Sequence, residues 1–180
     1  MSSYEFTREE FSRVFDGLRA RCSLYGPKRF PGRGRFTNTD LVKYAQLNGL
    51  EELELEEKSY MSPKSLAFPA DETLFYFTGQ EFAEAPQDGE GEIVVFLRPC
   101  DINGFRRLDA MFLENGGTRD PFYQRRRERL RFFMIECTES FDNCFCVSMK
   151  SNTADDYSAA LRFSGDSVLV EVKDDEFEGV

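Results

Sequence analysis

Apolar positions near the start of the chain recur at helical spacing and predict an amphipathic helix. Thr7 and Glu10 have the T-x-x-E spacing of a capping box, and Phe6 with Phe11 fits the hydrophobic staple that often accompanies one. Cys22 ends the apolar stripe, and we expect it to be a small core residue without a function of its own. The stripe comprises Phe11, Val14, Phe15, Leu18 and Cys22.

Two uninterrupted apolar runs in the second half of the chain are typical of strands buried on both faces. They are EIVVFLRP (92–99) and LRFFMIEC (130–137). Between them, Asp101 is expected to cap a helix, and Asp120 with Pro121 to open a second, arginine-rich helix over 122–131. A strand, two helices and a strand form a crossover unit, so the two strands are predicted to be parallel. The stripe of the first helix is Ile102, Phe105, Leu108, Met111 and Phe112.

The remaining segments complete the predicted fold class. Residues 160–173 read as a C-terminal β-hairpin, and 73–77 as a short strand. Residues 26–40 are rich in Gly, Pro and Arg and are expected to be mostly loop, 50–60 a polar, linker-like stretch, and 80–92 an exposed acidic segment. We therefore predict an α/β (or α+β) protein: a mixed sheet with a parallel β-α-α-β crossover unit, an N-terminal helix and a C-terminal hairpin.

Composition narrows the classes of partner. The 33 acidic residues outnumber the 23 basic ones and give a formal net charge of -10, which argues against nucleic acid as the main partner. No apolar run approaches the length of a membrane span, and the first residues lack the apolar core of a signal peptide. We expect a cytoplasmic protein that binds neither nucleic acid nor membrane.

The cysteines are the main candidates for chemistry. The chain has 5 cysteines and no histidine, so a metal would be held mainly by thiolate. Cys100 follows the first apolar run, Cys137 ends the second, and Cys144 and Cys146 lie in the segment directly after it. The carboxyl ends of parallel neighbours meet at one edge of a sheet, so we expect these four cysteines to converge there.

Several chemistries suit four convergent thiols. Tetrahedral Zn²⁺ and an iron–sulfur cluster both take such ligands, and the spacing does not distinguish them. Arg98 and Arg106 are placed to offset the charge of a cluster. Buried packing, a redox-active Cys144–Cys146 pair, and a nucleophilic Cys100 at a helix N-terminus are the alternatives. Apolar shielding is expected from Phe105, Phe132, Phe133, Phe141 and Phe145.

Longer motifs carry a family resemblance. FLRPCDINGFRRLDAMFL (96–113) and DPFYQRRRERLRFFMIECTESFDNCFCVSM (120–149) resemble the N-terminal domain of the anaerobic sulfite reductase A subunit, and are similar to the sulfhydrogenase β subunit. GPKRFPGRGRFTNTDLVKY (26–44), EKSYMSPKSLAFP (57–69) and ETLFYFT (72–78) extend the likeness over nearly the whole chain. These upstream motifs favour the sulfite reductase branch.

The resemblance implies electron transfer. Subunits of this kind pass electrons from a flavin subunit that uses a nicotinamide cofactor toward a catalytic subunit, and are not catalytic alone. It implies a [4Fe–4S] cluster on Cys100, Cys137, Cys144 and Cys146. The family continues into a ferredoxin-like module that this sequence lacks, so residues 1–180 are expected to be a single N-terminal iron–sulfur-subunit domain, truncated before that module. Its acidic surface and the helix over 122–131 would dock partner subunits.

Overall fold

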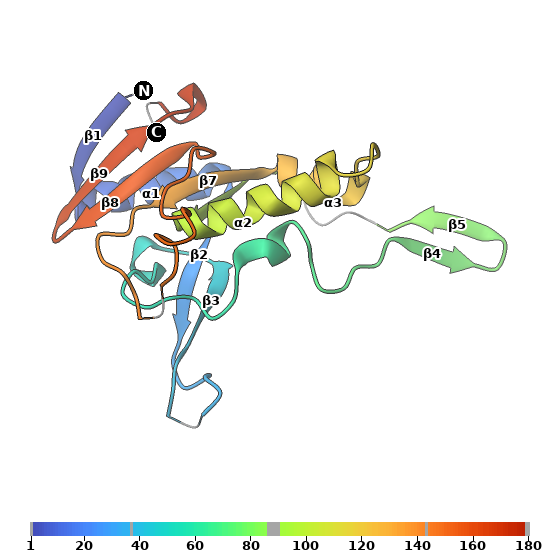
Figure 1. Ribbon diagram of the computed structural model, residues 1–180, viewed down its shortest axis with the longest axis horizontal. Helices are drawn as coiled ribbons and strands as arrows, with labels where there is room; N and C mark the ends of the chain where they lie inside the picture. Colours follow the sequence, from blue (N-terminus) through green and yellow to red (C-terminus); the bar gives the residue numbers. More distant parts are fainter. Residues whose placement is uncertain (1, 37, 86–90, 143, 179–180) are drawn as a thin grey trace.

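The computed structural model describes residues 2–36, 38–85, 91–142 and 144–178, which form a mixed seven-stranded sheet and a separate hairpin (Figure 1). The sheet has the order β1-β9-β8-β7-β6-β2-β3. Strands β2, β6, β7 and β8 are parallel neighbours, and antiparallel strands flank them on both sides. The strands are β1 (Ser2–Thr7), β2 (Ser23–Phe30), β3 (Leu41–Gln46), β6 (Ile93–Leu97), β7 (Leu130–Ile135), β8 (Ala159–Ser164) and β9 (Ser167–Val172).

Helices cover both faces of the sheet. Helix α1 packs on one face, and α2 and α3 pack on the other. Along β6, Val94 and Phe96 join the core under α1, whereas Val95 and Leu97 join the core under α2 and α3. The predicted α/β class, the crossover unit and the two doubly buried strands are therefore confirmed. The helices are α1 (Arg8–Arg21), α2 (Pro99–Asp109), which continues as a π-helical turn (Ala110–Glu114), and α3 (Pro121–Glu128); single 3₁₀ turns occupy Leu50–Glu52, Pro63–Leu66 and Asp175–Phe177.

The first helix begins where the sequence predicts. The Thr7 side chain accepts a hydrogen bond from the Glu10 backbone N–H at 3.2 Å, and the Glu10 carboxylate accepts one from the Thr7 N–H at 2.8 Å. The capping box is therefore complete. The rings of Phe6 and Phe11 lie 6.3 Å apart, which supports the hydrophobic staple.

The start of α3 is also confirmed, but that of α2 is not. The Asp120 carboxylate accepts hydrogen bonds from two backbone N–H groups of the first turn of α3. Helix α3 ends at Glu128, earlier than predicted, because β7 begins at Leu130. Asp101 is not the N-cap of α2. That helix begins at Pro99, which suits a first position because it has no N–H to leave unpaired.

Two segments expected to be irregular belong to the sheet and its cover. Residues 26–30 continue β2 as a strand, so the loop predicted over 26–40 is wrong for this part. Gly26 allows close packing, since a Cβ there would meet the Leu53 Cδ1 at 2.8 Å. Leu53 is buried and Leu55 packs against the same core, so the polar stretch over 50–60 covers the sheet instead of linking units.

Two hairpins complete the described chain. The β8–β9 turn contains Gly165 at φ 57° and confirms the C-terminal hairpin. The strand predicted over 73–77 is β4 (Phe75–Thr78), and it pairs with β5 (Glu81–Glu84), a strand within the segment that was expected only to be exposed. This β4–β5 hairpin projects away from the sheet (Figure 1), and both its strands are exposed. Residues 86–90 lie outside the described part of the chain.

No helix among the described residues is long and apolar enough to cross a membrane.

Candidate functional site

The parallel pair β6–β7 brings two of the predicted cysteines to one edge of the sheet. Leu97 of β6 stands opposite Met134 of β7, near the carboxyl end of each strand. Cys100 follows in the first turn of α2, and Cys137 lies two positions beyond the end of β7. The convergence predicted from a parallel crossover is therefore present for these two residues.

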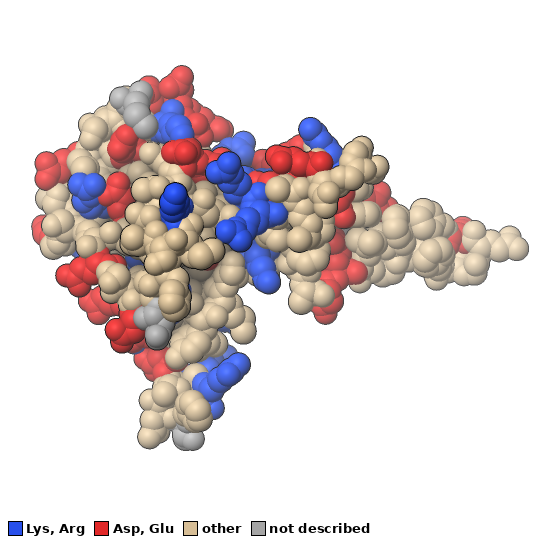
Figure 2. Space-filling view, viewed as in Figure 1, with Lys and Arg blue, Asp and Glu red and all other residues tan. Residues whose placement is uncertain are grey.

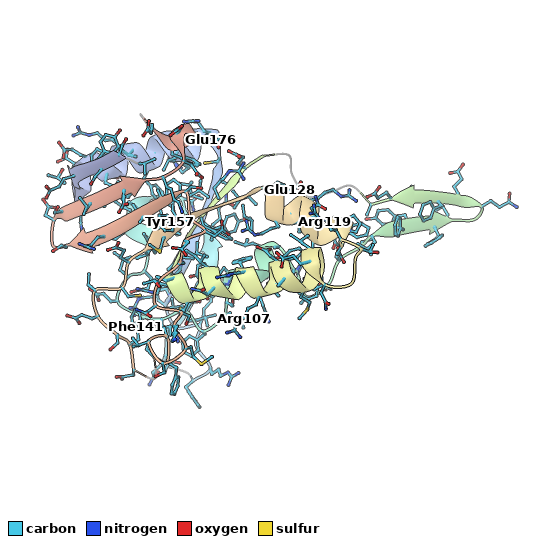
Figure 3. The ribbon with its side chains drawn as sticks, turned by 45° about the horizontal axis from the view of Figure 1, so that its top comes forward. Arg107, Arg119, Glu128, Phe141, Tyr157 and Glu176 are labelled. Atoms are coloured by element: carbon cyan, nitrogen blue, oxygen red, sulfur yellow. The ribbon has the colours of Figure 1, made fainter. Side chains whose placement is uncertain are left out.

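All four predicted cysteines line one pocket of about 210 Å³. Cys144 and Cys146 reach the pocket from the loop after β7. Phe141 of the same loop lies beyond the N-terminal end of α2 (Figure 3). The pocket wall also contains Pro99, Thr138, Glu139, Ser140, Phe141, Val147, Ser151 and Asn152.

Cys22 lies elsewhere, as predicted. It forms the C-terminal cap of α1, and its thiol donates a hydrogen bond to the Leu18 carbonyl oxygen at 3.1 Å. It packs against the core under α1. Because Cys22 is chemically the same as the pocket cysteines but remote from them, it provides a matched control.

The pocket cysteines are free thiols that share a wall without forming a compact ligand cluster. All five cysteines are unpaired, so Cys144 and Cys146 form no disulfide here. Within the described ranges, no three Cys, Asp or Glu side chains lie close enough together to hold a metal ion as they stand. Four thiols on one partly apolar pocket nevertheless match the donor set of an iron–sulfur cluster or of zinc. Binding would require the side chains to close around the metal.

Burial controls the acidity of Cys100. Desolvation, together with the nearby Asp101 carboxylate and the Cys137 thiol, raises the pKa of Cys100 to about 11. A thiol with this pKa is protonated at neutral pH and is a weak nucleophile. Metal binding would displace that proton, because thiolate is the ligand. The raised pKa therefore disfavours a nucleophilic role for Cys100 in the metal-free chain, and a bound metal would have to offset the same cost of deprotonation.

Alkylation tests this environment directly. Because the pKa of Cys100 is raised from 9.0 to about 11, its thiolate fraction at pH 8 falls roughly 100-fold relative to an unperturbed thiol. We expect iodoacetamide to modify Cys100 roughly tenfold more slowly in the folded, metal-free chain than in urea, because the greater nucleophilicity of a high-pKa thiolate offsets part of its lower abundance. Peptide mass spectrometry at several times measures the rates. Equal rates in the two states would contradict the shift.

Arg98 lies between the strand end and the pocket. Its Nη1 donates to the Cys137 Sγ at 3.3 Å, and its Nη2 donates to the Leu55 carbonyl oxygen at 2.7 Å. The guanidinium carbon lies 4.3 Å from the centre of the Phe141 ring. Arg98 is thus at the site as expected, whereas Arg106 is exposed and is not part of the pocket wall.

The expected aromatic shield is mostly somewhere else. Phe141 alone of the five predicted phenylalanines lines the pocket within the described chain. Phe105 and Phe132 pack in the core under α2, and Phe133 packs on the opposite face of the sheet. Phe145 is 71% exposed. Phe132 and Phe133 lie within β7, and adjacent side chains of a strand point to opposite faces of the sheet. Each therefore enters one of the two cores, and neither lines the pocket beyond the end of the strand.

Asn103 and Asp101 anchor the surroundings of the pocket, and neither role is predicted from the sequence. The Asn103 side-chain amide donates to the carbonyl oxygens of Pro99, at 2.9 Å, and Thr153, at 2.8 Å, which ties α2 to the end of the cysteine loop. The Asp101 carboxylate accepts a hydrogen bond from the Tyr44 hydroxyl at 2.9 Å. The only sequence signal for these roles is a polar side chain in the first turns of a helix.

Basic side chains gather over α2 in Figure 2, whereas the arginines of α3 are engaged in ion pairs within the chain. Three consecutive arginines of α3 form ion pairs with acidic residues from other segments, including the base of the β4–β5 hairpin. These arginines already have partners within the chain. The expected docking role of this helix stays a prediction. The pairs are Arg125 with Glu84, Arg126 with Glu72, and Arg127 with Asp109 and Asp156.

Fold and site together define an α/β protein with four cysteines around one pocket at the carboxyl edge of a parallel strand pair. No protein-family model matches the chain. No solved structure matches it either.

The chain is distantly homologous to a curated protein, sulfhydrogenase 2 subunit beta of Pyrococcus furiosus. The two are 30% identical over 167 residues, which cover 91% of this chain and 46% of that protein. The chain therefore spans about half the length of the curated relative it matches.

Proposed function

We propose that this chain is an electron-transfer domain of a multi-subunit oxidoreductase, and that Cys100, Cys137, Cys144 and Cys146 hold one [4Fe–4S] cluster. The observation that carries the proposal is the arrangement of these cysteines, which come from two strand ends and one loop to line a single pocket. The homologous subunit of a sulfhydrogenase supports the oxidoreductase class. When bound, a cluster of this type supplies one-electron transfer.

The residues of the chain would orient and shield that centre. Pro99, Phe141 and Val147 contribute apolar surface to the pocket wall. Asn103 links the helix that carries Cys100 to the end of the loop that carries Cys144 and Cys146. Apolar walls and hydrogen bonds around the sulfurs determine the potential of such a centre and the access of solvent to it.

Two complexes are candidates for the assembly. The motifs upstream of the cysteines resemble those of anaerobic sulfite reductase, in which the domain would pass electrons from a flavin and nicotinamide subunit toward the sulfite-reducing subunit. The homology to a sulfhydrogenase subunit supports a hydrogenase complex at least as well. The two candidate complexes can be distinguished by activity. The native complex would be purified under anaerobic conditions and assayed for sulfite reduction and for hydrogen production.

A non-catalytic scaffold with structural zinc is the alternative at the same residues. Zinc also takes four thiolates, and the pocket chemistry alone does not select iron. A thiol-dependent enzyme that uses Cys100 is less well supported, because burial raises the pKa of Cys100 to about 11.

Anaerobic reconstitution tests the proposal. We would incubate the reduced chain with iron and sulfide, remove unbound reagent, and measure iron, labile sulfide and zinc per chain together with the visible and EPR spectra. We expect about four irons and four sulfides per chain and an EPR signal on reduction. Stoichiometric zinc without iron would favour the zinc-binding scaffold. Binding of neither metal would contradict both the cluster proposal and the zinc alternative.

A further inference from the structure

Arg98 is a buried cation. Arg98 is 8% exposed, and among the described residues it shares the class of buried polar residues with Ser158. Burial of a charge is costly unless a group of opposite charge is close by. The structure should therefore supply an anion for Arg98.

No carboxylate in the described ranges forms an ion pair with Arg98. Its contacts are the Cys137 thiol, the Leu55 carbonyl oxygen and the Phe141 ring. The Asp101 carboxylate is close enough to interact electrostatically with Arg98, but it accepts a hydrogen bond from the Tyr44 hydroxyl and forms no direct ion pair with the guanidinium. Glu56 and Glu139 line the cavity next to Arg98 without pairing with it.

We propose that Arg98 is the counter-cation of the anionic centre held by the four cysteines, and that it raises the reduction potential of that centre. This inference rests on the proposed function. A [4Fe–4S] cluster with four thiolates is negatively charged in both redox states and carries one more negative charge when reduced. A fixed cation near the sulfur of a ligand stabilises the reduced state more than the oxidised state.

The surroundings hold the guanidinium in place independently of the thiol. One nitrogen donates to the Leu55 carbonyl oxygen, the guanidinium carbon lies over the Phe141 ring, and a second nitrogen donates to the Cys137 sulfur. Arginine suits this geometry because its donors form a rigid planar fork, whereas lysine offers one compact charge. Lysine at this position would keep the charge but could not make the two directed hydrogen bonds to Leu55 and Cys137 with a planar fork.

The experiment compares Arg98→Gln and Arg98→Lys with Arg106→Gln as the matched control. Arg106 lies on α2 and is exposed, so it reports the effect of removing an arginine charge outside the pocket. Each reconstituted chain would be analysed for iron and then titrated anaerobically with reductant while the EPR signal is followed. We expect a more negative midpoint potential for Arg98→Gln, an intermediate value for Arg98→Lys, and the wild-type value for Arg106→Gln.

The iron content and the midpoint potential together decide whether Arg98 acts as the counter-cation. Loss of iron in Arg98→Gln with retention in Arg98→Lys would also support the inference, because charge is the property that differs. Full iron in Arg98→Gln with an unchanged midpoint potential would overturn it and leave the proposed function standing. Loss of iron in both variants would indicate a packing role and overturn it too. Absence of iron from the wild-type chain would remove the proposed function and this inference together.

Discussion

Replacement of Cys100 by alanine is expected to abolish stable cluster binding. Cys100 lies at the start of α2 and, under the proposed function, would be the ligand that couples this helix to the loop after β7. Loss of one of four ligands would remove a sulfur–iron bond and open the centre to solvent, so we expect the affinity for the cluster to fall by more than the roughly 10–100-fold cost of losing an outer hydrogen-bond partner, and iron per chain to fall with it. Iron and sulfide analysis after anaerobic reconstitution measures the loss.

Cys22→Ala provides the matched control for this result. The same substitution removes a thiol at the end of α1, remote from the pocket, and should leave the iron content at the wild-type value. Cys137→Ala, Cys144→Ala and Cys146→Ala should behave like Cys100→Ala. A Cys100→Ala chain that retains the full iron and sulfide content would show that Cys100 is not a ligand.

Replacement of Phe96 by alanine is expected to be the most destabilising change in the core. Phe96 is 0% exposed, and its ring lies 5.5 Å from the rings of both Phe15 and Phe133. It therefore joins α1 to two adjacent parallel strands. We expect a loss of about 3–5 kcal/mol in the free energy of unfolding, the range for removal of a buried phenylalanine side chain.

Urea unfolding of the metal-free chain, followed by circular dichroism, measures this difference. Phe77→Ala is the control, because Phe77 is 76% exposed on the β4–β5 hairpin and should change the free energy of unfolding by less than about 0.5 kcal/mol. Similar losses for the two variants would contradict the assignment of Phe96 to the main core.

Much of the central fold was predictable because its residues are buried on both faces. β6 is continuously apolar, and Arg131 near the start of β7 is the one charged residue in these two strands, so apolar side chains face both helical layers. β2 was not predicted from the sequence. Its residues include Gly26 and Pro27, which usually indicate loops, and Gly26 packs closely against Leu53, a contact that no local pattern specifies.

For the candidate site, topology was more informative than side-chain detail. The approach of Cys100 to Cys137 follows from two parallel strands joined by a crossover, and this arrangement could be predicted from hydrophobic pattern alone. The contact of Arg98 with Leu55 and the link from Asn103 to Thr153 join segments far apart in sequence. No local pattern specifies such contacts, since they depend on how the loops pack.

The pairing of β1 with β9 has a consequence for the rate of folding. Ser2 stands opposite Val172, so an edge of the sheet forms only when segments from the two ends of the described chain meet. The loop that must close is long, and proteins dominated by such distant contacts fold slowly. During synthesis, β9, the partner of β1, emerges from the ribosome after β6 and β7. The thiols at the ends of β6 and β7 can therefore come together before this edge of the sheet has closed.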